Sequence, residues 1–318
     1  MPARRVHDQD LLAALQTTRS TSKLASMFGV TTRAIIYRLR ELGVPPAGNH
    51  VVAAQPPMPT SLMRAQGRLK TDITDGRVVV FSDAHFQPDA ISTANRALLK
   101  LLPGFEPAVV VCNGDAVDGA TTSRHAPIFG ERPPSAMQEL RASQQRLDDI
   151  ADAAGKARLI YTLGNHDIRL HAYLATSAPQ LADLPAVDLR VLFPRWDVCW
   201  SFWLNDSTII KHRYRGGQYA PANNVRGALG MSFVTGHLHS MKCIPLSSYA
   251  HKATAYGIDT GMLADPEWSA FAYREDSPAD WRSGFVVLTW ARGRLLWPEF
   301  VAVIEEGLVE FRGQLIEV

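Results

Sequence analysis

Five short polar motifs, each directly after an apolar run of strand character, constrain the fold of this chain more than any other feature. They hold five of its ten histidines and set them beside Asp and Asn. The motifs are Asp83-Ala84-His85, Asn113-Gly114-Asp115-Ala116-Val117-Asp118, Gly164-Asn165-His166-Asp167, Lys211-His212 and Gly236-His237-Leu238-His239. Oxygen and imidazole ligands delivered from successive strand ends are what a two-metal hydrolytic site requires.

The apolar runs before these motifs indicate buried strands, because each is short, continuous and β-rich. The expected strands are residues 77–82, 108–112, 157–163, 207–211 and 232–235, and amphipathic helices are expected at 91–102, 135–154 and 221–230. Residues 285–290, 295–304 and 308–316 indicate antiparallel strands, with Gly293 and Gly307 in the turns between them. This alternation predicts an α/β fold built as a layered sandwich.

A proline-rich segment divides the chain. Residues 45–59 contain five prolines and show no regular periodicity, which is typical of a semi-rigid linker. We therefore expect a small all-α domain at 1–44, a linker at 45–74 and the layered α/β domain at 75–318.

The two ends of the chain differ in charge. Residues 1–70 carry 10 Lys and Arg against 3 Asp and Glu, whereas the remaining 248 residues carry 23 against 28. A basic head on a mildly acidic body suggests a polyanionic partner for the head, and DNA fits this. The alternative is a basic, solvated face that binds nothing.

The head has the pattern of three short helices. Residues 8–17 form the first, Ser20 or Thr21 caps the second, and Thr31 or Thr32 caps a third that runs to Leu42. Gly29 supplies the tight turn before the third helix. The stretch 22–42 resembles the helix-turn-helix domains of bacterial and phage DNA-binding proteins.

That resemblance implies DNA contacts from the third helix and its surroundings. Thr31, Thr32, Arg33 and Tyr37 would face base edges, while Lys23 and Arg38 would contact phosphates. Such heads commonly work in pairs, so a homodimer is plausible. A three-helix unit of this size can also serve protein docking or oligomerisation, and the basic excess favours DNA over that alternative.

The five motifs, in order, closely resemble the series DxH, GDxxD, GNHD, H and GHxH of the calcineurin-like metallophosphoesterases. This resemblance implies an αββα-type sandwich around two metal ions. It implies that one ion is held by Asp83, His85 and His239, the other by Asn165, His212 and His237, and that Asp115 bridges them. His166 would protonate the leaving oxygen, with Asp118 holding it in orientation. Asp167 is expected to be a turn or cap residue.

Two divalent ions lower the pKa of a bridging water, which then attacks as hydroxide, and they neutralise charge on the phosphoryl oxygens. Mixed Asp, Asn and His ligation suits Mn, Fe or Zn better than Ca, which prefers oxygen cages. We expect Mn, with Fe, Zn and Mg as alternatives.

Several cations follow the motifs and could reach a bound phosphate. Arg124 follows the second motif and Arg169 the third. Arg213, Tyr214 and Arg215 form a basic patch with an aromatic residue, which could follow a nucleic-acid backbone or be only a solvated loop. Protein phosphatases of the superfamily place Arg-Gly after GDxxD, whereas Gly119 and Ala120 stand there in this chain. That difference disfavours a protein phosphatase.

Together these features predict a DNA phosphodiesterase, a nuclease similar to phage or prophage proteins of repair-exonuclease-like type. The alternatives are a phosphatase or phosphodiesterase acting on nucleotides or phosphoproteins, and a catalytically silent DNA-binding regulator. No apolar run reaches the ~20 residues of a membrane span, and the first residues do not resemble a signal peptide. Three cysteines without a CxxC pair favour the reducing cytosol of a bacterium or a phage-infected host.

Overall fold

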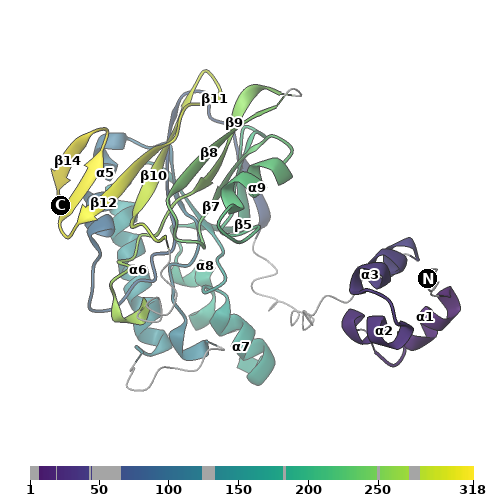
Figure 1. Cartoon of the computed structure of the whole chain (residues 1–318). Helices are drawn as coiled ribbons and strands as arrows, with labels where there is room; N and C mark the ends of the chain where they lie inside the picture. Colours follow the sequence, from purple (N-terminus) through teal and green to yellow (C-terminus); the bar gives the residue numbers. More distant parts are fainter. Residues whose placement is uncertain are drawn as a thin grey trace. The chain divides into compact units, whose positions relative to one another are not determined.

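A computed structural model of the protein describes residues 7–18, 20–42, 44, 66–123, 133–181, 184–248, 251–271 and 280–318. The chain divides into two compact units, Met1–Pro57 and Met58–Val318 (Figure 1). Among the described residues, no helix combines the length and the apolar character that a membrane crossing needs.

In the residues that the structure describes, the smaller unit is all-α, as expected. Its helices are α1 (Asp8–Ala14), α2 (Thr21–Phe28) and α3 (Thr32–Glu41). Ser20 caps α2 by accepting from the backbone N–H of Lys23, and Gly29 ends that helix in the left-handed region at φ 61°. The apolar core is formed by Leu11, Ala14, Leu24, Ala25, Ile35 and Leu39.

The larger unit is built on one continuous sheet of fourteen strands within the described residues. The strands are β1 (Gln66–Thr71), β2 (Gly76–Phe81), β3 (Val109–Cys112), β4 (Arg158–Thr162), β5 (Asp197–Leu204), β6 (Thr208–Ile210), β7 (Ser232–Thr235), β8 (Lys242–Ser248), β9 (His251–Asp259), β10 (Gly284–Ala291), β11 (Arg294–Leu295), β12 (Glu299–Glu305), β13 (Leu308–Phe311) and β14 (Gln314–Glu317). Its helices are α5 (Thr93–Phe105), α6 (Ala136–Ala153), α7 (Arg169–Ser177), α8 (Leu189–Leu192) and α9 (Ala220–Gly227), with short 3₁₀ turns η1 (Ala120–Thr122), η2 (Pro179–Leu181) and η3 (Pro185–Val187).

The sheet folds over on itself and makes the layered sandwich that the sequence predicts. Alternate residues of β2, such as Val79 and Phe81, pack with α5 and α6 on one face. The residues between them, such as Val78 and Val80, pack with β6, β7 and β9 on the other. Helix α9 contacts β7, β8 and β9 from the outside, so the order of layers is αββα (Figure 1).

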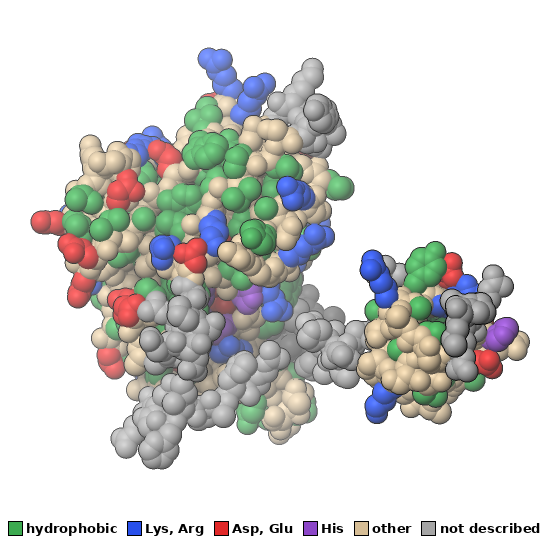
Figure 2. Space-filling model, viewed as in Figure 1, with side chains coloured by type: hydrophobic (Ala, Val, Ile, Leu, Met, Phe, Trp, Pro, Cys, Tyr) green, Lys and Arg blue, Asp and Glu red, His purple; other side chains and the backbone are tan. Residues whose placement is uncertain are grey.

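The five motifs follow β2, β3, β4, β6 and β7. Strands β2, β3 and β4 run parallel, as do β6 and β7, so each group delivers its motifs to one end. Folding of the sheet brings these ends together at one rim of the sandwich. Figure 2 shows histidine side chains at the surface of this unit, with Lys or Arg side chains next to them.

The structure differs from the predicted elements in several places. Residues 66–71, assigned to the linker 45–74, form β1 and pair in parallel with β5. Strands β5, β8 and β9 and helices α7 and α8 were not predicted. The segments 295–304 and 308–316 each contain two strands, and the turn between β13 and β14 includes Gly313 at φ 73°. Gly293 and Gly307 lie in turns with positive φ, as expected.

Candidate metal centre

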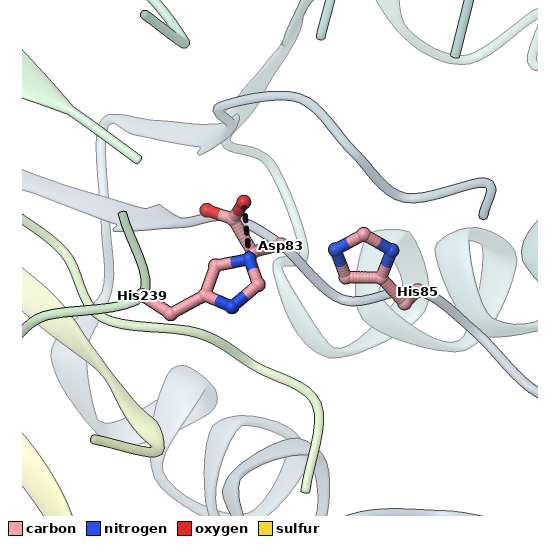
Figure 3. Close-up of side chains that lie close together, drawn as sticks. All are labelled: Asp83, His85 and His239. Atoms are coloured by element: carbon pink, nitrogen blue, oxygen red, sulfur yellow. Dashed lines mark ion pairs between the residues drawn. The ribbon is translucent and has the colours of Figure 1, made fainter. Parts of the chain in front are cut away.

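One cluster of ligand atoms joins the first motif to the fifth. Asp83 and His85 follow β2, and His239 follows β7 (Figure 3). Nε2 of His239 lies 3.1 Å from Oδ1 of Asp83, and one ligand atom from each of the three side chains lies within 4.8 Å of the others. All three residues are buried. These are the residues predicted to hold one metal ion.

A second cluster joins the second, fourth and fifth motifs. Asp115, His212 and His237 each offer a ligand atom within 4.8 Å of the others, and Nε2 of His212 lies 3.0 Å from Oδ2 of Asp115. Nδ1 of His212 lies 2.7 Å from the carbonyl oxygen of Asn113, to which it donates. With Nδ1 bound to this carbonyl, Nε2 is the ring nitrogen that can bind a metal ion once it gives up its proton.

Buried atoms at the site lack partners of the kind that a cation would supply. Nδ1 of His85 donates to Oδ1 of Asp118 at 3.0 Å, so its Nε2 carries a lone pair. Among the described residues, that Nε2, Oδ1 of Asn165 and Nδ1 of His239 are buried and accept no hydrogen bond. Unsatisfied buried acceptors are costly, and a divalent cation satisfies them. The residues present therefore fit a metal centre.

The backbone at the site is in an unfavourable region. Asp83, His85, Asp115, His237 and His239 have φ values of 52°, 39°, 54°, 72° and 58°. Residues other than Gly rarely adopt such values, and those that do cluster at functional sites. Here the left-handed conformation lets neighbouring residues of one short motif present ligands to the same centre.

Two motif glycines give the carboxylates room. A Cβ at Gly164 would collide with Oδ1 and the backbone N of Asp115, and one at Gly236 would collide with Oδ2 of Asp83. The glycines of the third and fifth motifs are therefore required by close approach.

The carboxylates and imidazoles are strongly coupled. Burial raises the pKa of Asp83, but the nearby His239 and His212 outweigh burial and bring that pKa to about 2. Burial likewise lowers the pKa of His212, yet Asp115 and Asp83 raise it to about 10. Burial and His212 lower the pKa of His237 to about 4. The carboxylates thus concentrate negative charge where a cation would bind.

His166 lies beside both clusters and is held from two sides. Its Nδ1 lies 2.8 Å from the carbonyl oxygen of Asp118 and 3.0 Å from Oδ1 of the same residue. Its Nε2 lies 2.9 Å from Nη2 of Arg169 and 3.9 Å from Oδ2 of Asp115. Burial lowers the pKa of His166, but Asp118 and Asp115 outweigh it and the net pKa is raised.

Two buried acids, one at the end of the third motif and one outside the motifs, hold the loop around Asp118. Asp167 accepts from the backbone N–H groups of Asp115, Ala116, Val117 and Gly164 and from the hydroxyl of Tyr161. It is a cap residue, as expected, and it fixes the second motif to the third. Glu139 of α6 accepts from the backbone N–H groups of Gly119 and Ala120. Sequence reasoning missed Glu139.

The predicted substrate residues divide into three groups. Arg169 joins the site, because Nη1 also donates to the carbonyl oxygen of Asp118 at 3.0 Å. Arg213, Tyr214 and Arg215 are exposed, with the Tyr214 ring stacked on Phe233. Arg124 lies outside the described residues.

On the smaller unit, Lys23, Thr31, Thr32, Arg33 and Tyr37 are exposed. Arg38 differs from them, because its guanidinium pairs with Asp8 of α1 at 2.7 Å and with Glu41. The charge of Arg38 is therefore partly neutralised within the unit, and its contact with Asp8 joins α1 to α3.

Solved structures resemble the chain at low identity. Vps29 from Entamoeba histolytica complexed with Zn²⁺ is 12% identical, with 76% of this chain and 98% of that chain covered and a TM-score of 0.40. Vacuolar protein sorting 29 from Cryptosporidium parvum is 11% identical over 77% and 97%, with a TM-score of 0.37. Yfce, a phosphoesterase from E. coli, is 14% identical over 70% and 97%, with a TM-score of 0.33.

No curated protein sequence matches the chain. The model of the calcineurin-like phosphoesterase family matches residues 76–241, just over half of the chain. The matched region begins at the start of β2 and ends two residues after His239, so it contains all five motifs.

Proposed function

The chain belongs to the calcineurin-like phosphoesterase family, and we propose that it is a nuclease that hydrolyses phosphodiester bonds in DNA. Membership makes it a metal-dependent hydrolase of phosphoester bonds. The observation that favours DNA is the presence of exposed cations on both units. Lys23 and Arg33 lie on the smaller unit, and Arg213 and Arg215 follow the candidate ligand His212. Phosphate contacts of this kind supply most of the affinity of non-specific DNA binding.

Two metal ions would be held by the clusters already described. Asp83, His85 and His239 would hold one, Asn165, His212 and His237 the other, and Asp115 would lie between them. When bound, the ions supply an activated water and neutralise phosphoryl charge. The mixed nitrogen and oxygen ligands suit Mn, with Fe, Zn and Mg as alternatives.

Side chains beside the clusters would then protonate the leaving oxygen and orient the phosphate. The carboxylate of Asp118 orients the His166 ring by accepting from Nδ1. The raised pKa of His166, caused by Asp118 and Asp115, favours the protonated ring that a general acid for the leaving oxygen requires. Arg169 lies beside Nε2 of the ring, where its guanidinium can hold a phosphate oxygen.

A phosphatase or phosphodiesterase acting on nucleotides is the second candidate. It is favoured by a cavity of about 440 Å³ next to the first motif, which exceeds the lower limit of about 300 Å³ for small-molecule sites. A silent DNA-binding regulator is disfavoured, because a scaffold without catalysis has no need for the His166–Asp118 pair.

An activity panel with added Mn²⁺ tests the proposal. Linear duplex, single-stranded and supercoiled DNA are compared with bis-p-nitrophenyl phosphate and p-nitrophenyl phosphate, using Asp115→Asn as the blank. Cleavage of DNA that is lost in Asp115→Asn is the expected result. Hydrolysis of the small esters with intact DNA would instead support the second candidate.

We also propose that the smaller unit is a helix-turn-helix that binds duplex DNA, as a pair of heads if the protein dimerises. Replacing both Lys23 and Arg33 by Ala should weaken duplex binding and reduce the salt slope by about 0.9 for each lost phosphate contact. Arg294→Ala, at an exposed position of β11, is the matched control. Equal affinities of wild type, the double variant and Arg294→Ala for duplex DNA would show that Lys23 and Arg33 of the smaller unit do not contribute to DNA binding.

A further inference from the structure

We propose that the cavity beside the first motif is a nucleobase subsite, which receives the base attached to the scissile phosphate. This inference rests on the proposed phosphoesterase function and specifies its substrate as a nucleoside phosphoester. The cavity has a volume of about 440 Å³ and is lined by Gln87, Asp89, Pro133, Pro134, Gln138 and Trp268, among others.

Two lining residues, Gln87 and Trp268, connect the cavity to the metal centre. On one side, Gln87 lies two residues after His85, and its Nε2 donates to the carbonyl oxygen of His85 at 3.1 Å. On the other side, the carbonyl of Trp268 accepts from the backbone N–H of Phe271 at 2.8 Å. The Phe271 ring lies 5.4 Å from the ring of His85 between centroids. A group attached to a phosphate at the metal centre is therefore a short distance from the cavity.

The chemistry of the lining disfavours a second phosphate. None of the residues that line the cavity, all of them in the described part of the chain, is Lys or Arg. Asp89 is among them and is exposed, so an anion in the cavity would meet a carboxylate. A carboxylate accepts instead from the ring or exocyclic N–H groups of a base.

The remaining polar groups suit a flat heterocycle with both donors and acceptors. Nε2 of Gln87 is used on the backbone, which leaves its Oε1 for a ligand. Oε1 of Gln138 accepts from Ser135 in the capping box of α6, which leaves its amide N–H groups. The two amides therefore offer one acceptor and one donor group to the cavity.

Trp268 supplies the surface for stacking. It packs against the buried cluster of Met262, Ala264 and Phe271 and is itself only partly buried. An indole that is held on one side and open on the other is the arrangement that proteins use to stack bases, largely independently of sequence. A simple alkyl ester has no group that would use this surface.

The test compares two esters with the same leaving group on the full-length, Mn²⁺-supplemented protein. One is the p-nitrophenyl ester of thymidine 5′-phosphate and the other is methyl p-nitrophenyl phosphate, which has no base. Trp268→Ala should raise KM for the nucleoside ester roughly 5- to 150-fold, the range of base stacking on an aromatic side chain. KM for the methyl ester should not change.

Two further variants separate stacking from folding. Trp268→Phe keeps an aromatic face and should retain most of the affinity for the nucleoside ester. Trp297→Ala removes an exposed Trp that packs against Tyr256 of β9 and does not line the cavity. This variant should behave as wild type with both esters. Saturation-transfer NMR with thymidine, which carries no phosphate, should show binding to wild type and not to Trp268→Ala.

The outcomes distinguish the subsite from the proposed function. Equal losses on both esters in Trp268→Ala, or a wild type that hydrolyses both esters with the same KM, would overturn the subsite and leave the phosphoesterase intact. Failure to hydrolyse either ester or DNA would overturn the proposed function, and thymidine binding would then decide the subsite alone.

Discussion

Nη2 of Arg169 lies 2.9 Å from Nε2 of His166, and a guanidinium can only donate. Nε2 therefore accepts in this structure, and the proton of the ring is on Nδ1, facing Asp118. For His166 to protonate a leaving oxygen from Nε2, the guanidinium has to turn away. An anionic phosphate between the two clusters would draw it away, which couples the arrival of substrate to the acidity of His166.

Replacing Arg169 by Ala should separate its effect on the acidity of His166 from its contact with the substrate phosphate. The positive charge of Arg169 lowers the pKa of His166, so its removal should raise that pKa further. The rate falls at high pH because His166 loses its proton there, so this basic limb of the kcat–pH profile should move to higher pH. KM should also rise, because a phosphate contact is lost. A basic limb at the wild-type pH, measured on DNA, whose alkoxide leaving group needs a proton, would contradict this coupling.

His166→Ala should remove the general acid without removing the metal ions. A positioned acid contributes typically about 10²- to 10⁴-fold, so kcat should fall by that factor. Metal content, measured by atomic absorption, should stay at the wild-type level, because His166 belongs to neither three-residue set of proposed ligands. An unchanged kcat would exclude the role assigned to His166.

Asp167→Asn should destabilise the larger unit through the loop that carries Asp115 and Asp118. Asn has one acceptor oxygen where the carboxylate has two, and its amide N–H groups would face backbone donors. Since hydrogen bonds to a buried charged group contribute about 1.5–3 kcal/mol each, the loss should reach at least ~2 kcal/mol, or roughly 4–8 °C in Tm. Asp206→Asn, at an exposed position paired with Lys70, is the control and should leave Tm within about 1 °C of wild type.

The strands that precede the five motifs were predictable to within about two residues, because each is a short continuous apolar run. Strand β1 was not, since Leu69 is the only member of its sequence Gln-Gly-Arg-Leu-Lys-Thr among the buried apolar residues. Its neighbour β5 stabilises it, with the Arg68 guanidinium 3.8 Å from the centre of the Trp203 ring. Contacts of this kind depend on tertiary structure and leave no local pattern.

The candidate ligands could be named from the sequence because they lie in short motifs, whereas the residues that support them do not. Glu139 is distant in sequence from the loop that it caps. One signal could have found it: it lies four residues before Ser143 and eight before Leu147, on the buried face of α6. Trp268 gave no such signal, because its role depends on where the chain between β9 and β10 returns to the first motif.

Gly164→Ala should abolish the second cluster. The added methyl would collide with Asp115, so the carboxylate would have to move away from His212. Bound metal should fall below the wild-type stoichiometry, and turnover should fall with it. Gly104→Ala is the matched control, because a Cβ there meets nothing within 4 Å. Full metal content in Gly164→Ala would show that the loop can shift without cost to the site.

Glu139→Gln should change how stability depends on pH. Burial and the negative charge of Asp118 raise the pKa of Glu139 to about 7, above its ordinary value of 4.5. Between these two pH values the folded protein binds more protons than the unfolded chain, so the free energy of unfolding falls as pH rises. Protonated Glu139 therefore contributes stability that is fully present below about pH 4.5 and is lost by about pH 7.

Gln cannot ionise, so Glu139→Gln should lack this loss. In metal-depleted protein, Tm of the variant minus Tm of wild type should increase from pH 4.5 to pH 7, and Glu305→Gln, at an exposed position, should show no such trend. Gln also has one acceptor for the two backbone N–H groups of Gly119 and Ala120, so the variant should be the less stable protein at low pH. A difference in Tm that is constant across this range would mean that Glu139 is ionised throughout. That would be expected if the histidines beside Asp118 neutralised its charge, because the two backbone N–H donors would then stabilise the Glu139 carboxylate.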